Sequence, residues 1–217
     1  MRGEDPRIIA LIMALRKTGV TDARVLSAIE DVPRDAFVAE PFRHAAYDNT
    51  ALPIQCGQTI SQPYVVACAT IALEVGPAMR ILEIGTGSGY QAAVLAKLCR
   101  RVYSIERHKP LMKEAEARLK ALKIDNVVTW YDDGMKGWPQ QAPFDRILLS
   151  AAVESVPPAL FDQLKVGGIL VAPVGPVGGG PGQEMPQQLT KYVRTEQGVV
   201  QEALIPVMFV PMLAGVA

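Results

Sequence analysis

The segment Ile81-Leu82-Glu83-Ile84-Gly85-Thr86-Gly87-Ser88-Gly89-Tyr90 gives the clearest indication of how this chain folds. A short apolar segment, typical of a buried strand, leads directly into glycines at alternate positions, and a helical pattern follows from Tyr90. Glycines at such a strand-to-helix turn let the backbone bend tightly and approach a ligand closely. A single glycine would indicate only a tight turn, whereas three glycines preceded by an acid indicate a binding loop.

The spacing of the glycines separates this loop from two other nucleotide-binding loops. A dinucleotide-binding loop of the Gly-x-Gly-x-x-Gly type needs its third glycine at position 90, which is Tyr90 here. No Gly-Lys-Ser/Thr follows, so the loop is not a P-loop. The pattern that remains is Glu-x-Gly-x-Gly-x-Gly, running from Glu83 to Gly89.

Acidic residues also follow the next two expected strands. Glu106 ends one of them, and a carboxylate there can accept both hydrogen bonds of a ribose diol. Its alternative is a solvated turn carboxylate paired with Arg107. Asp132-Asp133-Gly134 follows the next strand, where a carboxylate could accept from an adenine amine or simply belong to an ordinary turn. The position of both acids at one sheet edge favours the ligand role.

Alternating strand and helix patterns on either side of the loop predict an α/β fold with a doubly wound, mainly parallel sheet and helices on both faces. The expected strands are 79–84, 102–105, 127–131, 147–150 and 169–173, and the expected helices between them are 90–98, 112–122 and 158–164.

Helices are expected before this body, and a β-ribbon after it. Apolar residues at helical spacing indicate a helix over 8–15, and Thr21-Asp22 can cap a second helix that stops at Pro33. We expect a loop-rich connector over 41–57. The chain is interpreted as one domain, with a helical cap (1–60), an α/β cofactor-binding body (61–175), and a Gly/Pro loop and terminal ribbon (176–217), the ribbon strands being 189–194 and 203–210.

Composition excludes several classes of protein. The chain has 217 residues, of which 49% are hydrophobic, as in a globular protein. Its 22 Lys+Arg balance 22 Asp+Glu, which argues against a nucleic-acid binder. The start does not resemble a signal peptide and no apolar run is long enough for a membrane span, so we expect a cytoplasmic protein. Cys56, Cys68 and Cys99 are interpreted as reduced thiols, and no metal site is expected.

An uncharged polar segment, Gly57-Gln58-Thr59-Ile60-Ser61-Gln62-Pro63, precedes a helix expected to continue to Val75. In one interpretation Ser61 caps this helix, while Gln58 and Thr59 satisfy the loop backbone. In the other, polar side chains and free N–H groups at a helix N-terminus bind a carboxylate. The residues leave both interpretations open.

The Glu-x-Gly-x-Gly-x-Gly loop with an acid at the next strand end resembles the Rossmann-like S-adenosylmethionine-dependent methyltransferases. From about residue 22 to 211, the chain more closely resembles the protein-L-isoaspartate O-methyltransferase family, and the Gly-Gln-Thr-Ile-Ser segment is specific to that family. The segments that carry the resemblance are Val32-Pro33-Arg34-Asp35-Ala36-Phe37-Val38, Ala46-Tyr47, Leu52-Pro53-Ile54, Gly57 to Pro63, Leu82 to Leu95, Val102 to Arg107, Asp133-Gly134, Gly137-Trp138-Pro139, Ala142-Pro143-Phe144-Asp145 and Leu164-Lys165-Val166-Gly167-Gly168.

The resemblance implies methyl transfer from S-adenosyl-L-methionine to the free carboxylate of L-isoaspartyl residues in damaged proteins and peptides, with S-adenosyl-L-homocysteine as product. It implies Ser61 as the catalytic residue, and Ser61, Thr59 and Ile60 as substrate-binding residues. We expect a monomer that binds neither nucleic acid nor membrane. The cofactor-binding residues implied are Gln58, Thr59, Ile60, Glu83, Gly85, Thr86, Gly87, Ser88, Gly89, Glu106, Arg107, Asp133 and Gly134.

The chain departs from the family pattern at three places. Asp132 stands where the family usually has glycine, Cys56 occupies a variable position, and the Gly/Pro loop at 178–183 is longer than usual. We expect an extended substrate peptide to lie over the strand edges near the 174–186 loop and the tail. The alternatives are a methyltransferase acting on RNA or a small molecule, and a protein that binds cofactor or peptide without turnover.

Overall fold

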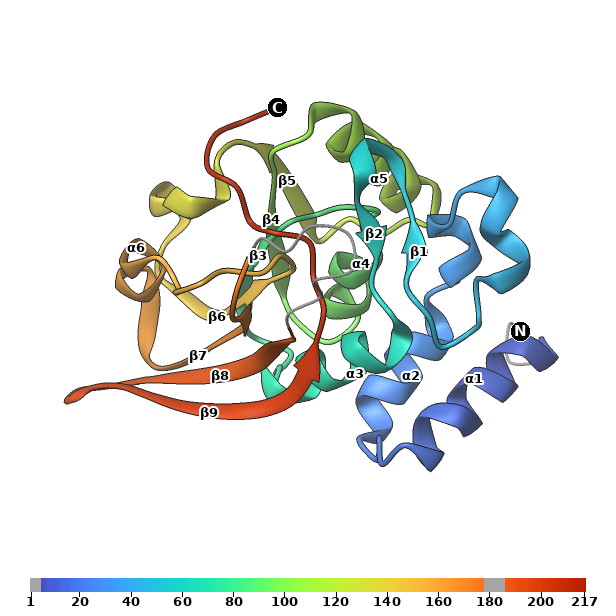
Figure 1. Cartoon of the computed structure of the whole chain (residues 1–217), viewed down its shortest axis with the longest axis horizontal. Coiled ribbons are helices and arrows are strands. Elements are labelled where there is room, and N and C mark those ends of the chain that lie inside the picture. Colours follow the sequence, from blue (N-terminus) through green and yellow to red (C-terminus); the bar gives the residue numbers. More distant parts are fainter. Residues whose placement is uncertain (1–4, 178–185) are drawn as a thin grey trace.

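The computed structural model describes residues 5–177 and 186–217, and its centre is a seven-stranded sheet in the order β5-β4-β3-β6-β7-β8-β9 (Figure 1). Strands β5, β4, β3, β6 and β7 are parallel, and β8 and β9 continue the sheet antiparallel to β7. The strands are β3 Arg80–Ile84, β4 Arg101–Glu106, β5 Val127–Tyr131, β6 Phe144–Leu149, β7 Leu164–Val174, β8 Gln187–Thr195 and β9 Gly198–Val207.

Helices cover both faces of this sheet, which confirms the doubly wound α/β prediction. Alternate residues of a strand point to opposite faces. Accordingly, Ile81 packs among residues of α3 and α4, whereas Leu82 packs with Leu160 of α6 on the other face. The helices of the body are α3 Pro63–Ala72, α4 Tyr90–Ala96, α5 Lys109–Ala121 and α6 Pro158–Asp162.

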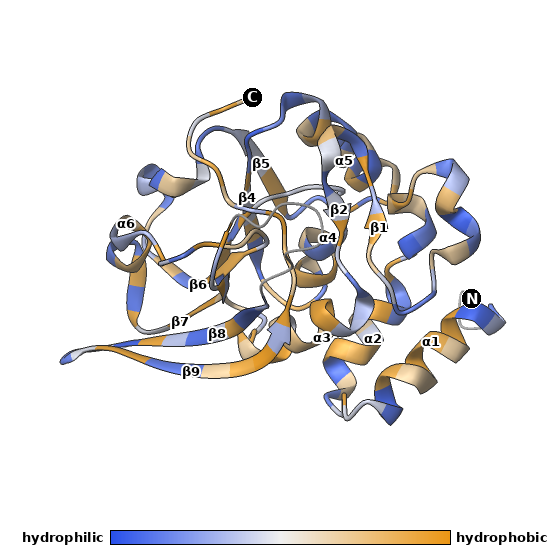
Figure 2. Ribbon diagram, viewed as in Figure 1, coloured by the Kyte–Doolittle hydropathy of each residue, from blue (hydrophilic) through white to orange (hydrophobic). Residues whose placement is uncertain are grey.

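The N-terminal helices pack outside α4 and form a further apolar cluster with it. In α1, Ile8, Leu11 and Leu15 are buried while Arg16 and Lys17 are exposed, and Figure 2 shows α1 mainly orange along its middle with blue at its ends. Asp22 caps α2 as predicted, accepting from the N–H groups of the first turn. The elements before α3 are α1 Pro6–Lys17, α2 Ala23–Asp31, η1 Arg34–Phe37, η2 Glu40–Ala45, β1 Leu52–Pro53, η3 Gln55–Gly57 and β2 Thr59–Ile60.

Several boundaries differ from the prediction; for example, α5 begins at Lys109 and β9 is Gly198–Val207. The strand expected over 169–173 is longer, because β7 already begins at Leu164 and includes Gly167-Gly168. The register with β6 jumps from Phe144↔Leu164 to Arg146↔Ile169, so the extra residues form a bulge, and Gly167 supplies its positive φ of 77°. The two predicted ribbon strands do pair with each other as β8 and β9, but the ribbon also extends the central sheet through β7.

A further difference concerns Ser61. One interpretation of the sequence made Ser61 the N-cap of α3, but Ser61 does not occupy that position. Pro63 occupies the first helical position, so Gln62 is the N-cap residue, and the side chain of Gln62 makes no capping bond. None of the helices in the described part of the chain has the length and apolar character that a membrane span requires.

Candidate active site

The glycine loop lies where β3 ends and α4 begins, at the carboxyl edge of the parallel strands. Gly85 has φ 96° and its N–H donates to Ile105 O of β4 at 2.8 Å, which fixes the start of the loop. Gly89 has φ 89° as the N-cap of α4, and a Cβ there would come within 3.1 Å of Ala115 Cβ. Both positions therefore favour glycine, one for the turn and one for the close approach of α5.

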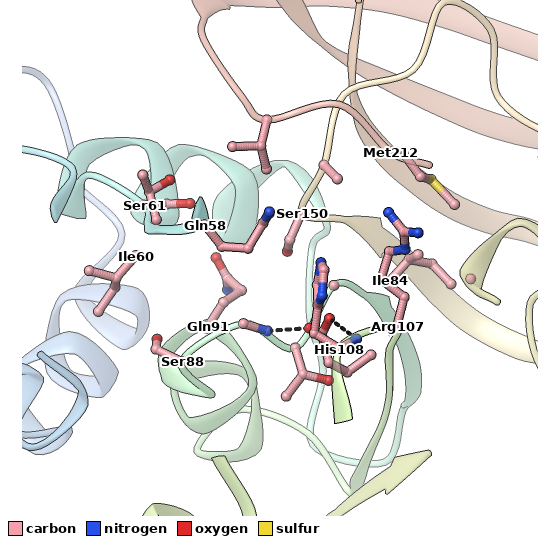
Figure 3. A pocket seen from close by; sticks show the side chains of 18 of the residues that line it. Gln58, Ile60, Ser61, Ile84, Ser88, Gln91, Arg107, His108, Ser150 and Met212 are labelled. Carbon is pink, nitrogen blue, oxygen red and sulfur yellow. Dashed lines mark hydrogen bonds between the residues drawn. The ribbon is translucent and has the colours of Figure 1, made fainter. Parts of the chain in front are cut away.

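Glu106, the last residue of β4, is 4% exposed and ties the glycine loop to the loop after β4. Its Oε2 accepts from Gly87 N at 2.8 Å and its Oε1 from His108 N at 2.9 Å, as the dashed lines in Figure 3 show. Each carboxylate oxygen has a further lone pair. Glu106 is thus held rigidly by backbone N–H groups while it can still accept from a ligand.

The turn 57–61 and the glycine loop line one cavity, which holds about 1090 Å³ of space not filled by protein atoms, part of it open to solvent. Figure 3 shows Ser61 and Ile60 on one side of this cavity and His108 and Arg107 on the opposite side. The predicted site residues that line it are Gln58, Thr59, Ile60, Ser61, Gly85, Thr86, Gly87, Ser88, Glu106, Arg107 and Gly134.

Three predicted cofactor ligands lie behind this lining, and Glu83 is the clearest correction. Glu83 is fully buried, and its Oε2 accepts from Ser104 Oγ of β4 at 2.5 Å. Ser104 Oγ is also 2.6 Å from Thr86 Oγ1. Burial, opposed by the Ser104 hydrogen bond, raises the pKa of Glu83 to about 8. Because strand residues Glu83 and Ser104 are register partners, this carboxyl supports the loop from beneath instead of touching a ligand.

Gly89 and Asp133 also have supporting positions. Gly89 packs against α5, as described above, and Asp133 Oδ1 accepts from Met135 N at 2.9 Å, capping the short helix η4 Gly134–Lys136. Gly134 itself lines the cavity, and a Cβ there would clash with Ile84 Cγ2. Asp132 Oδ1 accepts from Asp133 N at 2.7 Å, so the residue that departs from the family pattern stabilises this turn.

The hydroxyl of Ser61 makes no hydrogen bond to any described residue, and the side chain is half-buried at the cavity wall. Its neighbour Gln58 donates from Nε2 to Cys56 O at 3.1 Å, as the loop-satisfying interpretation expected. Ser61 therefore presents an uncommitted donor and acceptor beside the N-terminus of α3, where partial positive charge accumulates.

Several lining residues were not predicted from the sequence. Ser150 and Ala151 follow β6, so the strand-end rule that found Glu106 would have found them. Residues 210–213 come from the tail, which no motif marked. Ala152 N donates to Val210 O at 2.8 Å and Met212 N to Ala152 O at 2.7 Å, which brings the tail to the cavity. The remaining lining residues are Gly57, Val66, Ile84, Tyr90, Gln91, Ile105 and His108.

Arg107 lines the cavity but also holds the tail. Its Nε donates to Gly215 O at 3.1 Å, and Arg107 O accepts from Ala217 N at 2.8 Å. Among the residues described, Arg107 forms no ion pair with Glu106, which excludes the alternative proposed for that acid. All three cysteines are free thiols: Cys56 is exposed, Cys68 half-buried and Cys99 buried.

Comparisons with known proteins agree with this geometry. The protein-L-isoaspartate O-methyltransferase of Paramagnetospirillum magneticum is 58% identical over 216 residues, covering 100% of this chain and 99% of the relative. That of Parvibaculum lavamentivorans is 56% identical over 215 residues, covering 99% and 95%.

A solved structure of a protein-L-isoaspartate O-methyltransferase superposes with a TM-score of 0.81 at 27% identity, covering 94% of this chain and 65% of that longer one. A Plasmodium falciparum structure, described as such an enzyme in complex with S-adenosyl-L-homocysteine, has a TM-score of 0.78 at 25% identity, covering 94% and 97%. The family model for protein-L-isoaspartate(D-aspartate) O-methyltransferase matches residues 7–217. This chain therefore belongs to the protein-L-isoaspartate(D-aspartate) O-methyltransferase family.

Proposed function

We propose that this chain is a repair methyltransferase that moves a methyl group from S-adenosyl-L-methionine to the free carboxylate of L-isoaspartyl residues in damaged proteins and peptides. Membership of the family supports the reaction class. The observation that carries the proposal is the shared cavity: the Ser61 turn and the glycine loop line it together. A methyl donor and a carboxylate acceptor can therefore meet in one shared cavity.

The residues of the cavity suit this cofactor. Glu106 offers acceptor lone pairs for a ribose diol, and Ile84, Ile105 and Gly134 form an uncharged wall that suits a flat base. The backbone of Gly85 and Gly87 can approach the amino-acid end closely because neither residue has a side chain. When bound, the cofactor supplies a methyl group activated on a positively charged sulfur.

The acceptor needs no general base. An aspartyl-type carboxyl has a pKa of about 3.9 and is already ionised at neutral pH. A carboxylate oxygen forms the new O–CH₃ bond while the S–CH₃ bond breaks, which leaves a neutral thioether and a methyl ester. The ester then closes to a succinimide with loss of methanol, and hydrolysis returns some normal aspartate.

The role proposed for Ser61 is to orient this carboxylate. Its free hydroxyl donates one hydrogen bond, and the partial positive charge at the N-terminus of α3 attracts the anion. Backbone groups of Thr59 and Ile60 line the same wall. Alignment and exclusion of water supply the remaining catalysis, for which oriented intramolecular reactions set a scale of about 7–11 kcal/mol.

We further propose that an extended substrate peptide contacts the tail, because residues 210–213 line the cavity. The rest of the predicted peptide site, at 178–185, lies outside the described residues. The balanced charge of 22 Lys+Arg against 22 Asp+Glu supports a protein substrate over a nucleic acid. We propose that residues 1–217 act as a single methyltransferase domain, in monomeric form and in the cytoplasm.

One assay tests the function. The chain is incubated with S-adenosylmethionine carrying a tritiated methyl group and either an isoaspartyl peptide or the same peptide with a normal aspartyl linkage. We expect base-labile tritium on the isoaspartyl peptide alone. Equal labelling of both peptides, or labelling of neither, would refute the proposed substrate class.

A further inference from the structure

The N-terminus of α3, immediately after Ser61, is capped by a residue distant in the sequence. Asn49 Oδ1 accepts from Tyr64 N at 2.9 Å, which satisfies an N–H of the first turn. In return, Gln62 Nε2 donates to Asn49 O at 2.9 Å. These two reciprocal hydrogen bonds, here called the Asn49 clasp, join the connector before β1 to the residues that follow Ser61.

A second anchor holds the chain before Ser61. Strands β1 and β2 pair antiparallel with the register Leu52↔Ile60 and Pro53↔Thr59, and Ile54 N donates to Gln58 O at 2.9 Å. Ser61 therefore lies between the β1–β2 hairpin and the Asn49 clasp. Because its own hydroxyl bonds to no described residue, these neighbours determine where the Ser61 side chain lies.

We infer that Asn49 is a positioning residue for methyl transfer. Through the Asn49 clasp, it holds the Ser61 hydroxyl where that hydroxyl can donate to the acceptor carboxylate. The inference rests on the proposed function of Ser61. Asn49 is itself absent from the cavity lining, so it acts through the backbone of 62–64 and touches no reactant. The glycine loop and Glu106, which line the cofactor side of the cavity, belong to other elements, and hydrogen bonds of Glu106 to Gly87 N and His108 N hold them without the clasp.

Asn49→Ala removes the acceptor for Tyr64 N. A displacement of about 1 Å at a reacting group can cost about 100-fold in rate, so we expect kcat/KM for an isoaspartyl peptide to fall about 10- to 100-fold. We expect the fall mainly in kcat, with the Kd for S-adenosylmethionine changed less than about twofold, because the clasp does not hold the cofactor loops.

Two variants, Asn49→Asp and Asp22→Ala, distinguish a positioning role of Asn49 from a general loss of protein stability. Asn49→Asp keeps a side-chain oxygen at the same place and adds a charge that suits a helix N-terminus, so it should restore kcat/KM to within about threefold of wild type. Asp22 caps α2 with the same chemistry, away from the cavity. Asp22→Ala should therefore lower the melting temperature by an amount similar to Asn49→Ala while leaving kcat/KM unchanged.

A double-mutant cycle with Ser61→Ala tests the route of the effect. If Asn49 acts through Ser61, Asn49→Ala should reduce kcat/KM at least fivefold less in the Ser61→Ala background than in wild type. Gln62→Met breaks the other half of the clasp with little change of shape, and it should lower kcat/KM in the same direction. If Asn49→Ala does not fold, Gln62→Met tests the inference in its place.

Equal losses in both backgrounds, or full activity in Asn49→Ala and Gln62→Met, would overturn the inference. Failure of the wild-type chain to label the isoaspartyl peptide would instead overturn the proposed function, so the two failures are distinguishable.

Discussion

The buried carboxyl of Glu83 gives a quantitative prediction about stability and pH. Glu83→Gln keeps the shape of a protonated carboxyl, and its amide oxygen can accept from Ser104 Oγ as the carboxyl oxygen does in the wild type. In the wild type, burial raises the pKa of Glu83 from 4.5 to about 8. Between these values, the folded chain keeps the proton while the unfolded chain has lost it.

Proton linkage determines whether the free energy of unfolding rises or falls with pH. Unfolding releases the Glu83 proton in this range, so the free energy of unfolding falls as the pH rises from the unfolded to the folded pKa. One proton corresponds to about 1.4 kcal/mol for each pH unit, so the wild type should lose about 3 kcal/mol relative to Glu83→Gln between pH 5.5 and 7.5. The loss should level off above about pH 8.

The assay is urea denaturation of both proteins at pH 5.5, 6.5 and 7.5. Subtracting the two unfolding free energies removes the titration of all groups that they share. Glu202→Gln provides a control, because Glu202 is an exposed carboxylate on β9 whose removal should leave the pH dependence close to that of wild type. If the difference in unfolding free energy between wild type and Glu83→Gln is the same at all three pH values, Glu83 is not protonated in the folded chain.

Three substitutions in the cavity give further predictions. Ser61→Ala should reduce kcat for an isoaspartyl peptide about 10- to 100-fold, and a change under twofold would remove Ser61 from the reaction. Glu106→Ala should raise the Kd for S-adenosylmethionine, measured by calorimetry, at least tenfold, since a charge-assisted hydrogen bond contributes about 1.5–3 kcal/mol. Gly134→Ala should also weaken cofactor binding, because its Cβ would clash with Ile84 Cγ2; equal affinity would show that this wall can shift.

Much of the site could be predicted because local rules govern it. Parallel strands bring their carboxyl ends to one edge, so the glycines after β3 and Glu106 after β4 converge there. Glu83 was assigned to the ligand because an acid preceded the glycines. Its burial depends on Ser104 of the neighbouring strand, a partner that sequence order does not reveal.

The rest of the site depends on contacts that leave no local pattern. Ser61 satisfies the usual rule for an N-cap, yet Pro63 at the first helical position makes Gln62 the cap. The actual acceptor, Asn49, lies 15 residues before Tyr64. The tail reaches the cavity through backbone hydrogen bonds between Ala152 and residues 210–212, and such bonds do not require particular side chains.

The central claim is that the Ser61 turn and the glycine loop bring donor and acceptor together in one cavity. A crystal structure of this chain with S-adenosyl-L-homocysteine and an isoaspartyl peptide tests it most directly. We expect the cofactor sulfur inside the cavity, with the peptide carboxylate about 2.5–3.0 Å from Ser61 Oγ. A peptide carboxylate bound outside the cavity, or a sulfur separated from that carboxylate by protein, would show that donor and acceptor do not meet there.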